Sequence, residues 1–71
     1  MNVKDYGELL DILRETKARA LRLRKINDDE CLNAEDQKMK DYYAEEAAKH
    51  GILASRLDYF IRKIEETPVT P

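Results

Sequence analysis

Mainly apolar residues recur at intervals of three and four through most of the chain, in two separate stripes. Residues at this spacing occupy one face of an α-helix and form the seam along which two helices pack. The shorter stripe consists of Tyr6, Leu9, Leu13, Thr16, Ala20 and Leu23. The longer stripe consists of Asp36, Met39, Tyr43, Glu46, His50, Leu53, Leu57, Phe60 and Ile64.

Two facing stripes with a short polar connection predict an all-α fold, an antiparallel two-helix hairpin spanning residues 1–66. The first helix is expected at about residues 3–25, with Asn2 as its N-cap. The second helix is expected at about residues 33–66, and either Asn27 or the Asn33–Asp36 pair can start it. Residues 67–71 contain two prolines and no periodicity, which predicts a disordered end.

Gly51 interrupts the second stripe, and Lys49, His50 and Gly51 together resemble a helix C-terminus. The stripe nevertheless keeps its phase on both sides of the glycine, whereas a turn would normally reset it. A glycine inside a helix costs only about 1 kcal/mol relative to alanine. One continuous helix is therefore favoured over the alternative, a helix-turn-helix at residues 43–62.

The two predicted helices differ in length, at ~35 Å for the first and ~48 Å for the second. The second helix would then project past the first and leave large apolar side chains in water. Such an overhang predicts a homodimer that forms a four-helix bundle, or a binding surface for another protein. The residues expected in this interface are Leu53, Leu57, Phe60, Ile61 and Ile64.

The chain has 13 basic and 15 acidic residues, so its net charge is −2. One basic run nevertheless suits the binding of RNA or DNA phosphates. Acidic residues follow this run at once and would neutralise it at the closed end of the hairpin, and no aromatic residue interleaves it to stack on bases. Nucleic-acid binding is therefore the second hypothesis. The basic run consists of Lys17, Arg19, Arg22, Arg24 and Lys25.

Glu46 and His50 are polar residues on the second stripe, one helical turn apart, and Lys17 is expected at the level of Glu46. The three residues predict a polar layer that favours one register of the seam. In a dimer two Glu–His pairs would supply four metal ligands, but one hairpin supplies only two. We predict no metal, no cofactor and no catalytic residue, because no nucleophile–base pair or glycine-rich phosphate loop is present.

The single cysteine, Cys31, cannot form an internal disulfide, and no apolar run approaches the ~20 residues of a membrane-spanning helix. These features predict a cytoplasmic protein without a membrane role. The segment from Leu57 to Ile61 resembles the Leu-Asp-x-x-Ile element of small helical-hairpin phosphatases that act on sporulation response regulators. Ser55 lies two residues before Leu57 rather than three, so the phosphatase activity is not carried over.

The overall plan of two helices, a polar hinge and a ragged tail is also similar to plasmid copy-number RNA binders and to small secretion co-chaperones. A shared architecture does not fix a function. The residues favour a non-enzymatic regulatory or chaperone-like module that forms a homodimer and binds a protein partner through its helical faces. The alternative is a dimeric helical bundle that binds RNA or DNA through the basic run or the helix-turn-helix.

Overall fold

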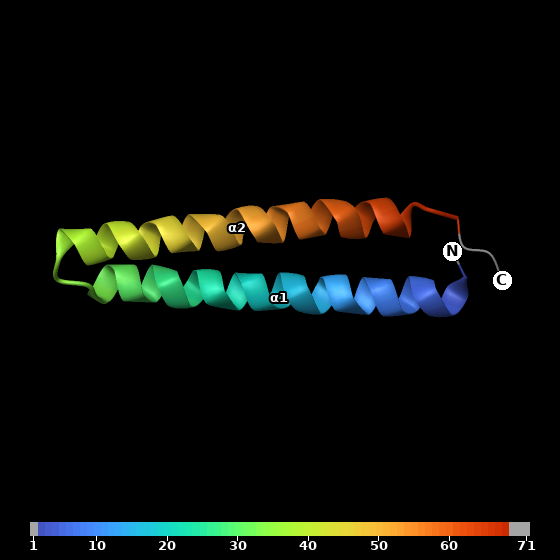
Figure 1. Cartoon of the computed structure of the whole chain (residues 1–71), viewed down its shortest axis with the longest axis horizontal. Coiled ribbons are helices and arrows are strands. Elements are labelled where there is room, and N and C mark those ends of the chain that lie inside the picture. Colours follow the sequence, from blue (N-terminus) through green and yellow to red (C-terminus); the bar gives the residue numbers. More distant parts are fainter. Residues whose placement is uncertain (1, 69–71) are drawn as a thin grey trace.

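The computed structural model describes residues 2–68 and consists of two antiparallel helices, α1 (Val3–Asn33) and α2 (Gln37–Glu65) (Figure 1). The described residues contain no strand, and α1 and α2 pack along their whole length. The pair forms a rod with extents of 56 × 14 × 11 Å. The predicted all-α helical hairpin is confirmed.

A side-chain cap fixes the start of each helix. The Asn2 side-chain oxygen accepts a hydrogen bond from the Asp5 backbone N–H at 2.8 Å, as predicted. The Asp36 carboxylate accepts a bond from the Lys38 backbone N–H at 3.3 Å and caps α2. Ala34 ends α1 because its backbone is extended, with φ −71° and ψ 136°. Of the two starts that the sequence left open, the structure uses the later one.

The first helix extends to Asn33, well beyond the predicted end near Lys25. Asn27 lies inside α1 as a half-buried residue and caps nothing, because no glycine or proline between it and Asn33 breaks the helix. The two helices have 31 and 29 residues, which makes them almost equal in length. The predicted overhang of the second helix is therefore wrong.

Gly51 lies within α2, which is one unbroken helix from Gln37 to Glu65. Neither glycine has a positive φ, so the backbone does not turn at this position. The prediction of a continuous helix is confirmed, and the alternative helix-turn-helix at residues 43–62 is wrong. The Arg24 side chain passes over Gly51, 3.5 Å from the position that a Cβ atom would occupy.

The core of α2 follows a seven-residue repeat, in which Ala47, Ala54 and Ile61 are buried against α1. The seam predicted for α2 is correct at every second position, because Tyr43, His50, Leu57 and Ile64 are half-buried and alternate with the buried residues. Its other apolar members are exposed, because each lies one residue before an inward position. These exposed members are Met39, Leu53 and Phe60.

The seam of α1 shows the same displacement. Tyr6, Leu13 and Ala20 point inward as predicted, with Ala20 only 2% exposed. The predicted Leu9, Thr16 and Leu23 each lie one residue before the residue that faces α2. The residues that face α2 at these levels are Leu10, which is buried, Lys17, which is half-buried, and Arg24, whose exposed side chain reaches over Gly51.

Candidate protein interface

On one side of the hairpin, ion pairs join α1 to α2. The Lys17 Nζ atom lies 2.8 Å from Asp58 Oδ1, and the Arg62 Nε atom lies 3.0 Å from Asp58 Oδ2. The hydrogen bond from Lys17 lowers the pKa of the Asp58 carboxyl group, and the nearby Arg62 charge adds to this effect. Arg14 and Glu65 extend the row toward the open end, with 3.9 Å between their charged groups. We name this side the ion-paired flank.

The opposite flank carries large apolar side chains from both helices. Leu23, Leu53 and Phe60 are 37%, 45% and 51% exposed, and each lies one residue before an inward position. Ile12 and Ile26 are also exposed. On α1 they lie one helical turn from Thr16 and Leu23, respectively, and further from α2. We name these five apolar residues the apolar flank.

The antiparallel register joins these side chains into one stripe. The contact between Lys17 and Asp58 shows the register of the two helices, in which Leu23 lies about level with Leu53 and Thr16 about level with Phe60. Leu23 of α1 and Leu53 of α2 therefore lie side by side on one edge of the rod, and Phe60 follows two turns along α2 on the same edge. A stripe of this kind is the surface against which a further helix packs.

The apolar flank continues onto the outer face of α2. The rings of Tyr59 and Phe60 meet edge to face with 5.5 Å between their centroids, and the Lys63 ammonium lies 5.5 Å from the Tyr59 ring. A hollow of about 490 Å³ opens beside Phe60 on this face, where Ile52 and Arg56 also line it. The exposed aromatic rings are thus held in a fixed arrangement at the surface.

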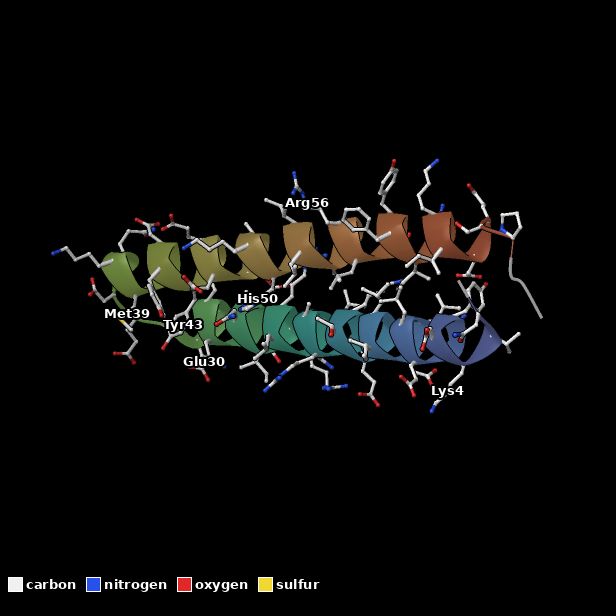
Figure 2. All side chains as sticks on the ribbon, turned by 45° about the vertical axis from the view of Figure 1, so that its right-hand side comes forward. Lys4, Glu30, Met39, Tyr43, His50 and Arg56 are labelled. Atoms are coloured by element: carbon white, nitrogen blue, oxygen red, sulfur yellow. The ribbon has the colours of Figure 1, made fainter. Side chains whose placement is uncertain are left out.

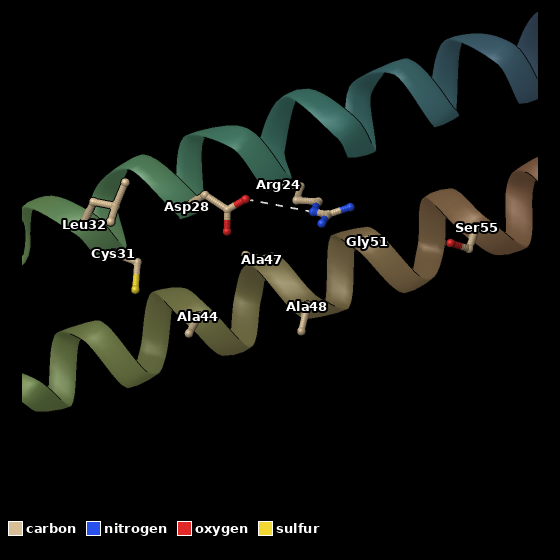
Figure 3. Close-up of a pocket in the computed structure, with 9 residues that line it drawn as sticks. All are labelled: Arg24, Asp28, Cys31, Leu32, Ala44, Ala47, Ala48, Gly51 and Ser55. Carbon is tan, nitrogen blue, oxygen red and sulfur yellow. Dashed lines mark ion pairs between the residues drawn. The ribbon is translucent and has the colours of Figure 1, made fainter.

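A second hollow, of about 620 Å³, lies on the ion-paired flank near the closed end (Figure 3). It exists because α2 presents only small residues there, including Ala44, Ala48 and Gly51. Arg24 borders this hollow and pairs with Asp28 at 3.9 Å. Cys31 also borders it, and its thiol donates a hydrogen bond to the Lys40 carbonyl oxygen at 3.3 Å.

The interface residues predicted from the overhang do not share one environment. Ile61 is buried against α1, and Leu57 and Ile64 are half-buried in the seam. Leu53 and Phe60 are the two that remain exposed, and both belong to the apolar flank. The reason is that α1 reaches the end of α2 and covers the residues that a shorter helix would have left in water.

The predicted basic run is divided between two sides of α1. Lys17 points inward to Asp58, and Arg24 is engaged with Asp28 and Gly51. Arg19, Arg22 and Lys25 are exposed and form no ion pair with any residue between 2 and 68. The five residues therefore do not make a single basic surface.

The predicted polar layer also changes its partners. His50 is half-buried between the helices (Figure 2), whereas Glu46 pairs with Lys49 at 3.2 Å. The hydrogen bond to Glu46 raises the pKa of Lys49. The prediction that Lys17 lies at the level of Glu46 is wrong, because α1 is longer than predicted, so the hinge lies further along the chain and Lys17 pairs with Asp58. A role of these residues in fixing the register stays a prediction.

Comparison of the chain with models of known protein families, with curated proteins and with solved structures finds no match. Between residues 2 and 68, no three or more His, Cys, Asp or Glu side chains gather closely enough to hold a metal ion. Neither helix in this range is long and apolar enough to cross a membrane. The function is therefore argued from the surface of the hairpin itself.

Proposed function

We propose that the hairpin is a non-enzymatic protein-binding module, regulatory or chaperone-like, that packs its apolar flank against a helix of another protein chain. The asymmetry between the two flanks carries this proposal. Charged groups join α1 to α2 on one flank, whereas Leu23, Leu53 and Phe60 are exposed side by side on the other. A contiguous exposed apolar surface of this kind marks an interaction site.

The exposed area of the chain supports the same function. The accessible surface is 5591 Å², whereas a monomeric globular protein of 8.3 kDa exposes about 4,600 Å². The excess of roughly 1,000 Å² matches the ~800 Å² that each partner contributes to a typical interface. A rod of two helices hides only one stripe on each, so a further helix is the natural way to bury the excess.

Self-association into a four-helix bundle would use this same flank. Two hairpins stacked on it would bury Leu23, Leu53 and Phe60 between them. The overhang on which the dimer prediction was based is absent, so that prediction now rests on the apolar flank alone. A dimer and a complex with another protein are therefore two possible occupants of one surface.

A photo-crosslinking residue in place of Leu53 tests the proposed function in the native host. We expect it to capture a second protein chain, because Leu53 lies at the centre of the apolar flank. The matched control carries the same residue in place of Ala48, which is exposed on the ion-paired side of α2. Equal capture from both positions, or no capture from Leu53, would contradict the proposal.

Binding of RNA or DNA is the second candidate function. One observation favours it, since Arg19, Arg22 and Lys25 are exposed without ion pairs among the described residues. Against it, Glu15 borders the same outer surface as Arg19 and Arg22, and a carboxylate repels phosphate. The protein-binding function therefore comes first.

Charge reversal at Arg19 and Arg22 distinguishes these two functions in a gel-shift titration with host RNA and DNA. We expect no tight complex with either the unaltered chain or the double variant. Charge reversal at Arg14 and Arg62 on the ion-paired flank is the matched control, because it changes the net charge equally. Tight binding that weakens steeply with salt, and that only the first double variant loses, would place nucleic-acid binding first.

A further inference from the structure

Basic residues lie beside the apolar flank, three in a row on α2 and one, Arg19, on α1. Lys49, Arg56 and Lys63 follow one another at intervals of seven residues along α2, so they share one row beside Leu53 and Phe60. On α1, Arg19 lies between Ile12 and Ile26 in the corresponding row. The apolar surface therefore has a basic row along its α2 side and one arginine on its α1 side.

Two of these basic residues have no ion-pair partner between residues 2 and 68, although Glu15 lines the same surface hollow as Arg19. Arg19 and Arg56 form no ion pair with the described part of the chain, whereas Lys49 and Lys63 have Glu46 and Glu66 within 4 Å. Arg56 projects from α2 on the side away from α1 (Figure 2).

The register that pairs Lys17 with Asp58 also places Arg19 level with Arg56. The two guanidinium groups therefore lie on opposite edges of the flank at one level. Leu23 and Leu53 lie a short distance toward the closed end, and Phe60 lies toward the open end. A ligand that covers these three apolar side chains has to pass between the two arginines.

We propose that the occupant of the apolar flank is an amphipathic helix of a different protein, with acidic residues on both sides of its apolar stripe. This inference rests on the proposed function and names the class of partner. The apolar stripe of such a helix would cover Leu23, Leu53 and Phe60. Its carboxylates would pair with Arg19 and Arg56, whose planar guanidinium groups suit two-pronged bonds to carboxylate.

A second copy of the chain fits this surface less well, because a two-fold dimer sets each patch against itself. If the axis runs along the rod, α1 stacks on α2 of the other copy, and Arg19 meets Arg56 of the partner subunit. If the axis crosses the rod at this level, each arginine meets its own equivalent. Like charges meet in both arrangements, and such contacts select against a partner.

Two synthetic helical peptides test the inference with the full chain. Both carry the same leucine stripe, which is flanked by glutamates in one peptide and by lysines in the other. Fluorescence anisotropy should show that the acidic peptide binds at least about tenfold more tightly at low salt. The difference should shrink as salt screens the exposed charges.

Two pairs of substitutions identify the residues responsible. The Arg19→Glu and Arg56→Glu double variant should lose or reverse the preference for the acidic peptide. The matched control, Arg22→Glu with Lys25→Glu, changes the net charge by the same amount at exposed α1 residues outside the border row and should keep the preference. Helical circular dichroism of each variant establishes that the chain is folded.

The outcomes separate this inference from the proposed function. Equal affinity for the two peptides, with loss of both in Leu53→Asp, overturns the acidic partner and leaves the binding flank in place. A salt-independent dimer in sedimentation equilibrium, with neither peptide bound, assigns the flank to a second copy and also overturns the inference. A monomer that binds neither peptide, with no capture from position 53, overturns both proposals.

Discussion

In the described part of the chain, two ion pairs join the helices in addition to the buried core, Lys17 with Asp58 and Arg14 with Glu65. Lys17 occupies an inward position of the seam, where an apolar residue would pack better, and its ammonium reaches Asp58 on the other helix. Both side chains are about one third exposed, at 34% and 32%, so solvent weakens their attraction. That this pair favours one register of the hairpin stays a prediction.

The Asp58 contact predicts a pH dependence of stability. Because folding lowers the pKa of Asp58, its contribution is complete above the unfolded-state pKa of about 4 and is lost as the pH falls through the lower folded-state pKa. The urea midpoint of Asp58→Asn should therefore lie below that of the unaltered chain at about pH 6, and the gap should close as the pH falls through the folded-state pKa of Asp58.

Asp11→Asn is the control for this measurement, because Asp11 is exposed and forms no ion pair with the described residues. It should leave the midpoint almost unchanged over the same pH range. A gap between Asp58→Asn and the unaltered chain that persists at the acidic end of that range would show that the substitution acts through packing instead of charge.

Each helix is specified by local signals that agree with one another. Asn2 and Asp36 cap the two N-termini, and Arg62 and Lys63 place positive charge in the last turn of α2, where the helix dipole favours it. Gly51 is the exception, since it lies in the middle of α2 without a backbone conformation that requires glycine. The Arg24 side chain of α1 passes over Gly51, and this contact is the reason to expect a small residue there.

Gly51→Ala should stabilise the hairpin by about 1 kcal/mol in urea denaturation, because alanine favours the helix and restricts the unfolded chain. The added Cβ atom would lie 3.5 Å from the Arg24 side chain, which is an ordinary contact distance. Gly7→Ala is the comparison, since its Cβ atom would meet nothing within 4 Å. Stabilisation at Gly7 but not at Gly51 would mean that Arg24 needs the space.

The whole molecule is a rod with a thin core. Between residues 2 and 68 the buried apolar residues are one isoleucine, one leucine and three alanines, so the hairpin buries little apolar area of its own. The alanines let the two helices approach closely, and several large apolar side chains, among them Leu23, Leu53 and Phe60, lie outside the seam. The apolar flank therefore exists only in the packed hairpin, because its side chains come from both α1 and α2.

Alanine substitutions at two adjacent residues should separate the core from the apolar flank. Ile61→Ala should destabilise the isolated hairpin by about 2–3 kcal/mol, because Ile61 is buried against α1. Phe60→Ala should cost less than about 1 kcal/mol, because Phe60 is half exposed. Chemical denaturation of both variants measures the difference. Comparable losses from the two substitutions would place Phe60 in a packed core and contradict the phase of the seam.

The sequence by itself determined the helices, their antiparallel pairing, the cap at Asn2 and the continuity of α2 through Gly51. These features depend on periodicity and on contacts within a few residues, which can be read along the chain. The far end of α1 was missed, because Asn27 looks like a stop signal when its packing against α2 is unknown.

The tertiary structure alone decided which edge of each stripe faces inward. A three-four spacing allows two phases that differ by one residue, and both phases of α2 contain large apolar side chains, such as Phe60 in one and Ile61 in the other. Packing against the other helix selects between the two phases. The helices can approach closely only where small residues lie between their backbones, at Ala20, Ala47 and Ala54. That choice leaves Phe60 exposed on the apolar flank and brings Asp58 to Lys17.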